Sequence, residues 1–138
     1  MPKRVLFFMT FLFLISSIAL AAPGDLDTTF DSDGIAIYAA AEYGTALAIQ
    51  SDGKIVVVGG YDNSMDLDVL VLRYNADGSL DTTFGTGGVV TYDSGDYEEG
   101  RALAIQSDGK IVVVGSTEGT SNRDVLVLRY DADGSLDS

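Results

Sequence analysis

The residues from Ala46 to Gly59 recur letter for letter from Ala102 to Gly115, an offset of 56 positions. The run Asp68–Tyr74 likewise returns, unchanged, as Asp124–Tyr130. A tandem repeat constrains the fold more than any single residue does, because each unit must bury its apolar surface against the next.

The repeat extends to the turn motif that precedes each copy. Gly24–Phe30 matches Gly78–Phe84 at an offset of 54 residues. Copy one therefore covers about residues 24–77, copy two about 78–133, and residues 134–138 begin a third copy. The change of offset is confined to residues 39–43 and 93–99, which predicts a surface loop there.

Each period contains four short runs rich in β-forming residues. In copy two they are residues 88–92, 101–106, 110–114 and 124–130, with an Asp-Gly hairpin turn at 108–109. The last two runs are apolar on both faces, so both faces must be covered. We expect an all-β fold of tandem four-stranded antiparallel repeats, each period forming one β-propeller-like blade. A β-solenoid and two separate sandwiches are the alternatives.

The number of copies bears on how the fold closes. Propellers have about 4–8 blades, and this chain has two full copies. We therefore expect the repeats to be part of a larger array or of a truncated product. Alternatively, several chains complete a ring. The expected partners are further repeats of the same type or other copies of the chain.

The first 21 residues have the order of a secretory signal peptide. Lys3 and Arg4 precede an apolar run over residues 5–20, and Ala19-Leu-Ala21 ends it with small residues. The run is shorter than the roughly 18–20 residues of a spanning helix, so cleavage after Ala21 is favoured over an uncleaved anchor. The expected location is secreted, periplasmic or cell-surface, with no membrane span after cleavage.

The chain is acidic, with a net charge of −13 that becomes −15 once Lys3 and Arg4 are removed. Such a charge disfavours nucleic acid and anionic membranes as partners. Cysteine and histidine are both absent. Disulfides, Ser-His-Asp or Cys-His catalysis and the usual zinc sites are therefore excluded. Carboxylate pairs for glycoside hydrolysis remain.

Three motifs in fixed order resemble the bacterial delta-60 repeat family. They are Leu80–Gly85, Ala102–Gly115 and Leu128–Asp137, and together with their copies they cover nearly all of the expected mature chain. The resemblance implies tandem arrays in exported or surface proteins with a propeller-like fold. It implies no established activity, catalytic residue or cofactor.

The acidic turns are the candidate metal ligands. Two equivalent turns place oxygen-bearing side chains around a glycine, and their candidates are Asn75, Asp77, Asp81, Asp131, Asp133 and Asp137. Calcium takes about 6–8 oxygen ligands from such loops. The alternative is plain turn chemistry, in which Asp and Asn accept backbone hydrogen bonds and glycine takes a positive φ.

Several residues have structural interpretations. Arg73 and Arg129 end apolar strands near Asp77, Asp81, Asp133 and Asp137, which predicts a carboxylate bridge within each repeat. Arg73→Met should therefore destabilise the fold. We interpret Tyr74 and Tyr130 as edge packing, and Phe30 and Phe84 as anchors between blades.

The leading functional hypothesis is an exported, non-enzymatic repeat module that presents loops 61–66 and 116–123, where the copies differ, to protein or glycan ligands. No catalytic or cofactor-binding residue is expected. The alternatives are a calcium-stabilised adhesive array and a carboxylate-based hydrolase. The non-repeated acids to test for the latter are Glu42, Glu98, Glu99 and Glu118.

Overall fold

The structure is a computed structural model that describes residues 22–119 and 122–138, and these residues form strands and turns without a helix. The strands are β1 (Tyr43–Ile49), β2 (Ile55–Asp62), β3 (Leu67–Tyr74), β4 (Val89–Tyr92), β5 (Tyr97–Ile105), β6 (Ile111–Glu118) and β7 (Arg123–Tyr130). The expected all-β class is confirmed. The expected signal segment, residues 1–21, lies outside the described residues. Among those residues, no helix is long and apolar enough to cross a membrane.

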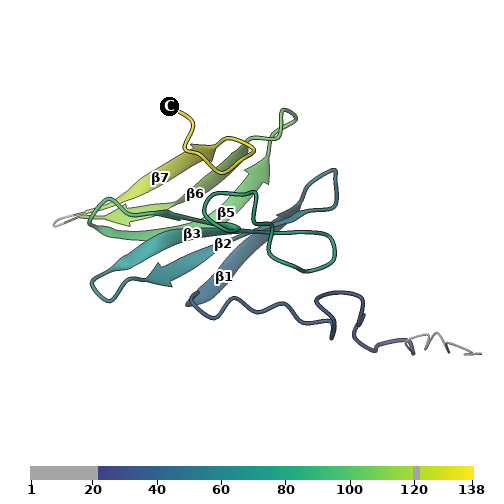
Figure 1. The fold of residues 1–138 in the computed structure, drawn as a ribbon. Helices are drawn as coiled ribbons and strands as arrows, with labels where there is room; N and C mark the ends of the chain where they lie inside the picture. Colours follow the sequence, from purple (N-terminus) through teal and green to yellow (C-terminus); the bar gives the residue numbers. More distant parts are fainter. Residues whose placement is uncertain (1–21, 120–121) are drawn as a thin grey trace, which may run out of the picture.

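The strands form two antiparallel sheets that pack face to face (Figure 1). The first sheet has the order β1-β2-β3-β4, and the second has the order β5-β6-β7. The hairpins β1–β2 and β5–β6 turn at the Asp-Gly pairs, where Gly53 and Gly109 have φ of 85° and 86°. Glycine adopts this left-handed conformation without a Cβ penalty, so the hairpin expectation is confirmed.

The first sheet crosses the boundary between the sequence copies. Residues 89–92 belong to copy two, yet they pair with β3 of copy one, with Leu72 opposite Val89 and Val69 opposite Tyr92. The intervening Leu-Asp-Thr-Thr-Phe turn brings the chain back: the Asp81 amide donates to the Arg73 carbonyl at 2.8 Å, and the Arg73 amide donates to the Gly88 carbonyl at 3.0 Å. The expectation that each period forms its own sheet is therefore wrong by one strand.

The core lies between the two sheets. The first sheet contributes Val56, Val58, Val69 and Val71, and the second contributes Ile111, Val113, Leu128 and Tyr130, with Phe84 from the connecting turn. Burial at about 25 cal/mol per Å² makes this apolar layer the main stabilising element. A side-chain hydrogen bond adds to it, since the Thr45 hydroxyl donates to the Gly100 carbonyl of β5 at 2.7 Å.

Candidate functional site

Arg73 joins the end of β3 to the turn that follows β7. Its Nε donates to Asp81 at 2.7 Å, and its NH1 donates to the Ala132 carbonyl at 2.5 Å. Its guanidinium carbon lies 4.6 Å from the centroid of the fully buried Phe84 ring. The expected pairing of arginine with a carboxylate is confirmed, but the expectation that it lies within one repeat is wrong, because Asp81 belongs to the start of the next copy. The expected role of Phe84 as an anchor is confirmed as well.

Asp81 is the most strongly stabilised carboxylate of this junction. Burial acts to raise its pKa, but hydrogen bonds from Lys54, Thr83 and Arg73 outweigh burial and hold the pKa far below its usual range. Lys54 Nζ lies 2.6 Å from Asp81 Oδ2. The equivalent Arg129–Asp137 pair forms at the end of β7, but there the arginine side chain is 53% exposed, against 7% for Arg73.

The six calcium candidates lie in two equivalent turns and are engaged by protein groups. Asp77 Oδ1 accepts hydrogen bonds from the amide and hydroxyl of Ser79 at 3.0 and 2.6 Å, and Asp133 does the same with Ser135. These hydrogen bonds, the side-chain one foremost, lower the pKa of both carboxyls. Asn75 Nδ2 donates to Ser79 Oγ at 3.0 Å.

Cations engage the remaining candidates. Lys54 and Arg73 contact Asp81, whereas Lys110 contacts both Asp131 and Asp137. The hydrogen bond from Lys110 is the main cause of the lowered pKa of Asp137. A calcium ion at either turn would have to displace these partners.

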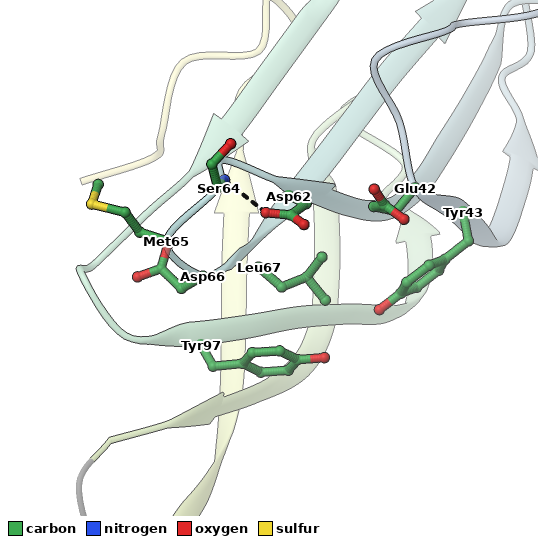
Figure 2. A pocket seen from close by; sticks show the side chains of 8 residues that line it. All are labelled: Glu42, Tyr43, Asp62, Ser64, Met65, Asp66, Leu67 and Tyr97. Carbon is green, nitrogen blue, oxygen red and sulfur yellow. Dashed lines mark hydrogen bonds between the residues drawn. The ribbon is translucent and has the colours of Figure 1, made fainter.

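A pocket of about 440 Å³ opens where the two sheets meet at the β2–β3 hairpin (Figure 2). Tyr43 begins β1 and Tyr97 begins β5, so each sheet contributes one aromatic ring. The lining residues are Glu42, Tyr43, Asp62, Ser64, Met65, Asp66, Leu67 and Tyr97. Ser64 has a φ of 77°, and its amide donates to Asp62 Oδ1 at 2.7 Å, which fixes the hairpin tip.

Three lining residues differ in chemistry from their counterparts in the other copy, whereas Glu42 and Asp62 correspond to the acids Glu98 and Glu118. Tyr43 corresponds to Glu99, Tyr97 to Ala41, and Met65 to Ser121. Burial raises the pKa of Tyr43 to about 12, and the Glu99 carboxylate adds to the shift, so the phenol stays neutral at physiological pH. The pocket thus combines the phenol groups of Tyr43 and Tyr97 with the carboxyls of Glu42, Asp62 and Asp66. Sequence comparison identified loop 61–66 as variable but did not indicate that Tyr97 would join it.

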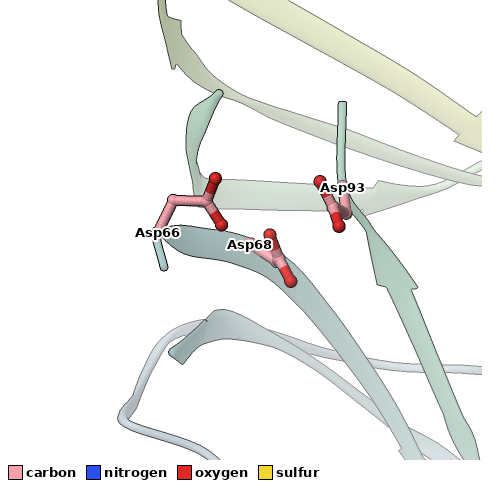
Figure 3. A group of neighbouring side chains, drawn as sticks. All are labelled: Asp66, Asp68 and Asp93. Atoms are coloured by element: carbon pink, nitrogen blue, oxygen red, sulfur yellow. The ribbon is translucent and has the colours of Figure 1, made fainter. Parts of the chain in front are cut away.

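Three carboxylates that sequence reasoning missed lie close together, and one of them, Asp66, also lines the pocket (Figure 3). Asp66, Asp68 and Asp93 each place one oxygen within 4.8 Å of the others. Burial is the main cause of the raised pKa of Asp68, and the Asp93 charge raises it further, against hydrogen bonds from Asn63. Three ionised carboxylates at this distance repel one another. Binding of a proton or a cation to the cluster relieves this repulsion.

The four acids proposed for a hydrolase are dispersed, and Glu42 and Glu98 occupy equivalent positions of the two copies, so these two are repeated after all. Glu42 lines the pocket, while Glu98 is fully buried and accepts hydrogen bonds from Ser94 and Thr117. Glu99 pairs with Arg101 at 2.7 Å, and Glu118 pairs with Arg123 at 2.6 Å.

The two tyrosines at the strand ends differ in environment. Tyr130 is buried in the core, and burial raises its pKa, so its interpretation as packing is confirmed. Tyr74 is half-buried beside Tyr38 on the outer face of the first sheet. Phe30 is also half-buried and lies against Gly78.

Two antiparallel sheets with a repeated turn motif between them define a pair of β-propeller-like blades. Residues 50–84 and 106–138 match a family model described as a domain of unknown function (DUF5122) with a β-propeller fold. The matched segments begin 56 residues apart, which is the repeat period. The match supports a β-propeller repeat family. No curated protein matches the chain.

Proposed function

We propose that this chain is an exported, non-enzymatic repeat module of the bacterial delta-60 type that binds a basic segment of a partner protein at the pocket between its blades. The repeated turns, hairpins and core form a constant scaffold. The single observation that carries the proposal is the pocket, because its two tyrosines, Tyr43 and Tyr97, are not repeated between the copies.

The lining suits a lysine or arginine side chain. The carboxyls of Glu42, Asp62 and Asp66 attract a cation, and the exposed rings of Tyr43 and Tyr97 offer π faces. A cation over an aromatic face gains about 0.5–2 kcal/mol. The net charge of −13 steers a basic partner toward the module. The sixteen-residue apolar run at residues 5–20 supports export.

A titration followed by NMR tests this function. A lysine-rich hexapeptide should shift the resonances of Tyr43 and Tyr97, and Glu42→Gln should weaken the binding at least severalfold, because one pocket charge is lost. Asp108→Asn is the matched control, since it removes the same charge from an exposed hairpin turn outside the pocket. Shifts with a neutral oligosaccharide and none with the peptide would reassign the pocket to glycans.

A calcium-stabilised module is a second candidate, favoured by the Asp66, Asp68 and Asp93 cluster. Three carboxylates supply part of the roughly 6–8 oxygens that calcium takes, with loop carbonyls and water as the remainder. Millimolar calcium should then raise the melting temperature, and Asp93→Asn should abolish the rise while the exposed control Asp96→Asn retains it. A rise lost instead on Asp77→Asn would assign calcium to the turns.

A further inference from the structure

The two sheets differ at one edge although β3 and β7 share the same seven residues, Asp68–Tyr74 and Asp124–Tyr130. β3 pairs with β2 on one side and β4 on the other, whereas β7 pairs with β6 and, within the described residues, with no strand on its outer side. The faces of β3 and β7 differ as well: Val69 and Val71 are 0% exposed because they pack on the second sheet, and their counterparts Val125 and Val127 are 79% and 63% exposed. An uncovered edge strand with exposed valines is a template for pairing with another strand.

The chain also contains an unused counterpart of β4. Residues 35–38 follow the first Leu-Asp-Thr-Thr-Phe motif as β4 follows the second, and they form no strand. Both motifs dock alike, because the Asp31 amide donates to the Asp77 carbonyl and the Gly85 amide to the Asp133 carbonyl, each at 2.7 Å. The chain therefore continues from residue 34, after the first motif, in the same way as it continues from residue 88 after the second motif. Ile37 is 80% exposed.

The outer faces of the two sheets repeat the chemistry of the buried interface. Leu103 and Ile105 of the second sheet pack into the core, and their counterparts Leu47 and Ile49 on the first sheet are exposed. Conversely, the first sheet buries Val69 and Val71, whose counterparts are the exposed valines of β7. The outer face of the first sheet thus carries the leucine and isoleucine side of the interface. The outer face of the second sheet carries the valine side.

We propose that copies of this chain associate head to tail, with residues 35–38 of one copy added as the fourth strand on β7 of another. The β3–β4 register transfers directly through the repeat offsets. It places Ile35 opposite Leu128, Ala36 opposite Val127, Ile37 opposite Leu126 and Tyr38 opposite Val125.

The occupant is a second copy because this one sequence supplies both halves of the contact. The added strand gains main-chain hydrogen bonds along β7, as in other cases of strand addition. The outer face of the second sheet then packs on the outer face of the first sheet of the neighbour, as the two sheets pack within one chain. A contact of this head-to-tail kind closes into a ring or continues as a filament, depending on its rotation.

Disulfide trapping tests the register, since the chain has no cysteine of its own. Ala36→Cys chains mixed with Val127→Cys chains under mild oxidation should form an interchain disulfide. Neither position is buried, so both variants should fold. Val125→Cys is the out-of-register control and should cross-link at least about tenfold more slowly, because diagonal neighbours lie roughly 7–8 Å apart. Equal rates for the two positions would overturn the register.

Sedimentation of the full chain tests the association itself. In 0.15 M salt, which screens the net charge of −13, the weight-average mass should rise with concentration. Ile37→Lys should weaken association at least about tenfold without lowering the melting temperature. Met65→Lys, at an exposed residue of the β2–β3 hairpin outside the contact, should leave association unchanged. A monomer throughout would overturn the proposal. So would an intrachain disulfide in a monomeric Ala36→Cys/Val127→Cys double variant, because the segment would then close on its own chain.

Discussion

At the residue scale, the repeat offers matched pairs of identical residues in different surroundings. Arg73 is buried against Phe84 and the Ala132 carbonyl, whereas Arg129 has only its carboxylate partner and is half exposed. The sequence predicts the arginine–carboxylate pairing in both copies because the spacing is the same. It could not predict the difference in burial, which depends on whether a following sheet covers the junction.

Asp81→Asn should destabilise the fold strongly. The substitution leaves the buried Arg73 guanidinium without its counter-charge, and removing one partner of a buried pair costs about 3 kcal/mol. Chemical denaturation of the variant measures the loss. Asp137→Asn is the matched control: its arginine stays solvated, so its melting temperature should remain near that of the parent chain. Equal losses for both variants would contradict the proposed role of burial.

The same carboxyl predicts how stability depends on pH. The folded-state pKa of Asp81 lies below the unfolded value of about 3.9. Its contribution is therefore complete above that value and is lost as the pH falls toward the folded-state pKa. The free energy of unfolding should fall between about pH 5 and pH 2, and it should fall less steeply in Asp81→Asn. Parallel pH profiles would exclude Asp81 as the source.

At the scale of elements, the sequence predicts the strands but not their grouping. The hairpins at Asp52-Gly53 and Asp108-Gly109 are local, and turn chemistry identifies them. The pairing of β3 with β4 depends on the turn between them. The boundary between the copies, as drawn from the sequence alignment, falls within this turn at an arbitrary point, so the alignment assigns the two strands to different copies. The pocket was hidden for a related reason, since Tyr97 reaches it only because β5 lies beside the first sheet.

Gly44 and Gly100 occupy equivalent positions in the two copies, but the space around them differs because only Gly100 lies against the other sheet. A Cβ at Gly100 would lie 2.5 Å from Val58 Cγ2, whereas a Cβ at the equivalent Gly44 would meet only Val57 Cγ1, at 3.5 Å. Gly100→Ala should therefore cost about 1–3 kcal/mol through overpacking. Gly44→Ala should be close to neutral. Thermal unfolding of the two variants compares them directly, and a neutral Gly100→Ala would contradict the close approach of β5 to β2.

At the scale of the whole molecule, the two blades form one sandwiched core and leave two complementary apolar faces. The sequence alone indicates that two copies are few for a propeller and that other copies of the chain could complete it. The structure adds which strand would be shared, because β4 shows where residues 35–38 belong. The number of blades in an assembly depends on the rotation between successive copies.

Each blade is completed by a strand that follows a Leu-Asp-Thr-Thr-Phe motif: β4 completes the first blade within the chain, and residues 35–38 of another copy complete the second. Residue-resolved hydrogen exchange measured at low and high protein concentration tests this claim most directly. Backbone amides of β4 that pair with β3 should be protected at both concentrations, whereas those of residues 35–38 should exchange rapidly when dilute and gain protection as copies associate. Loop-like exchange in β4, or exchange at residues 35–38 that does not change with concentration, would contradict the claim.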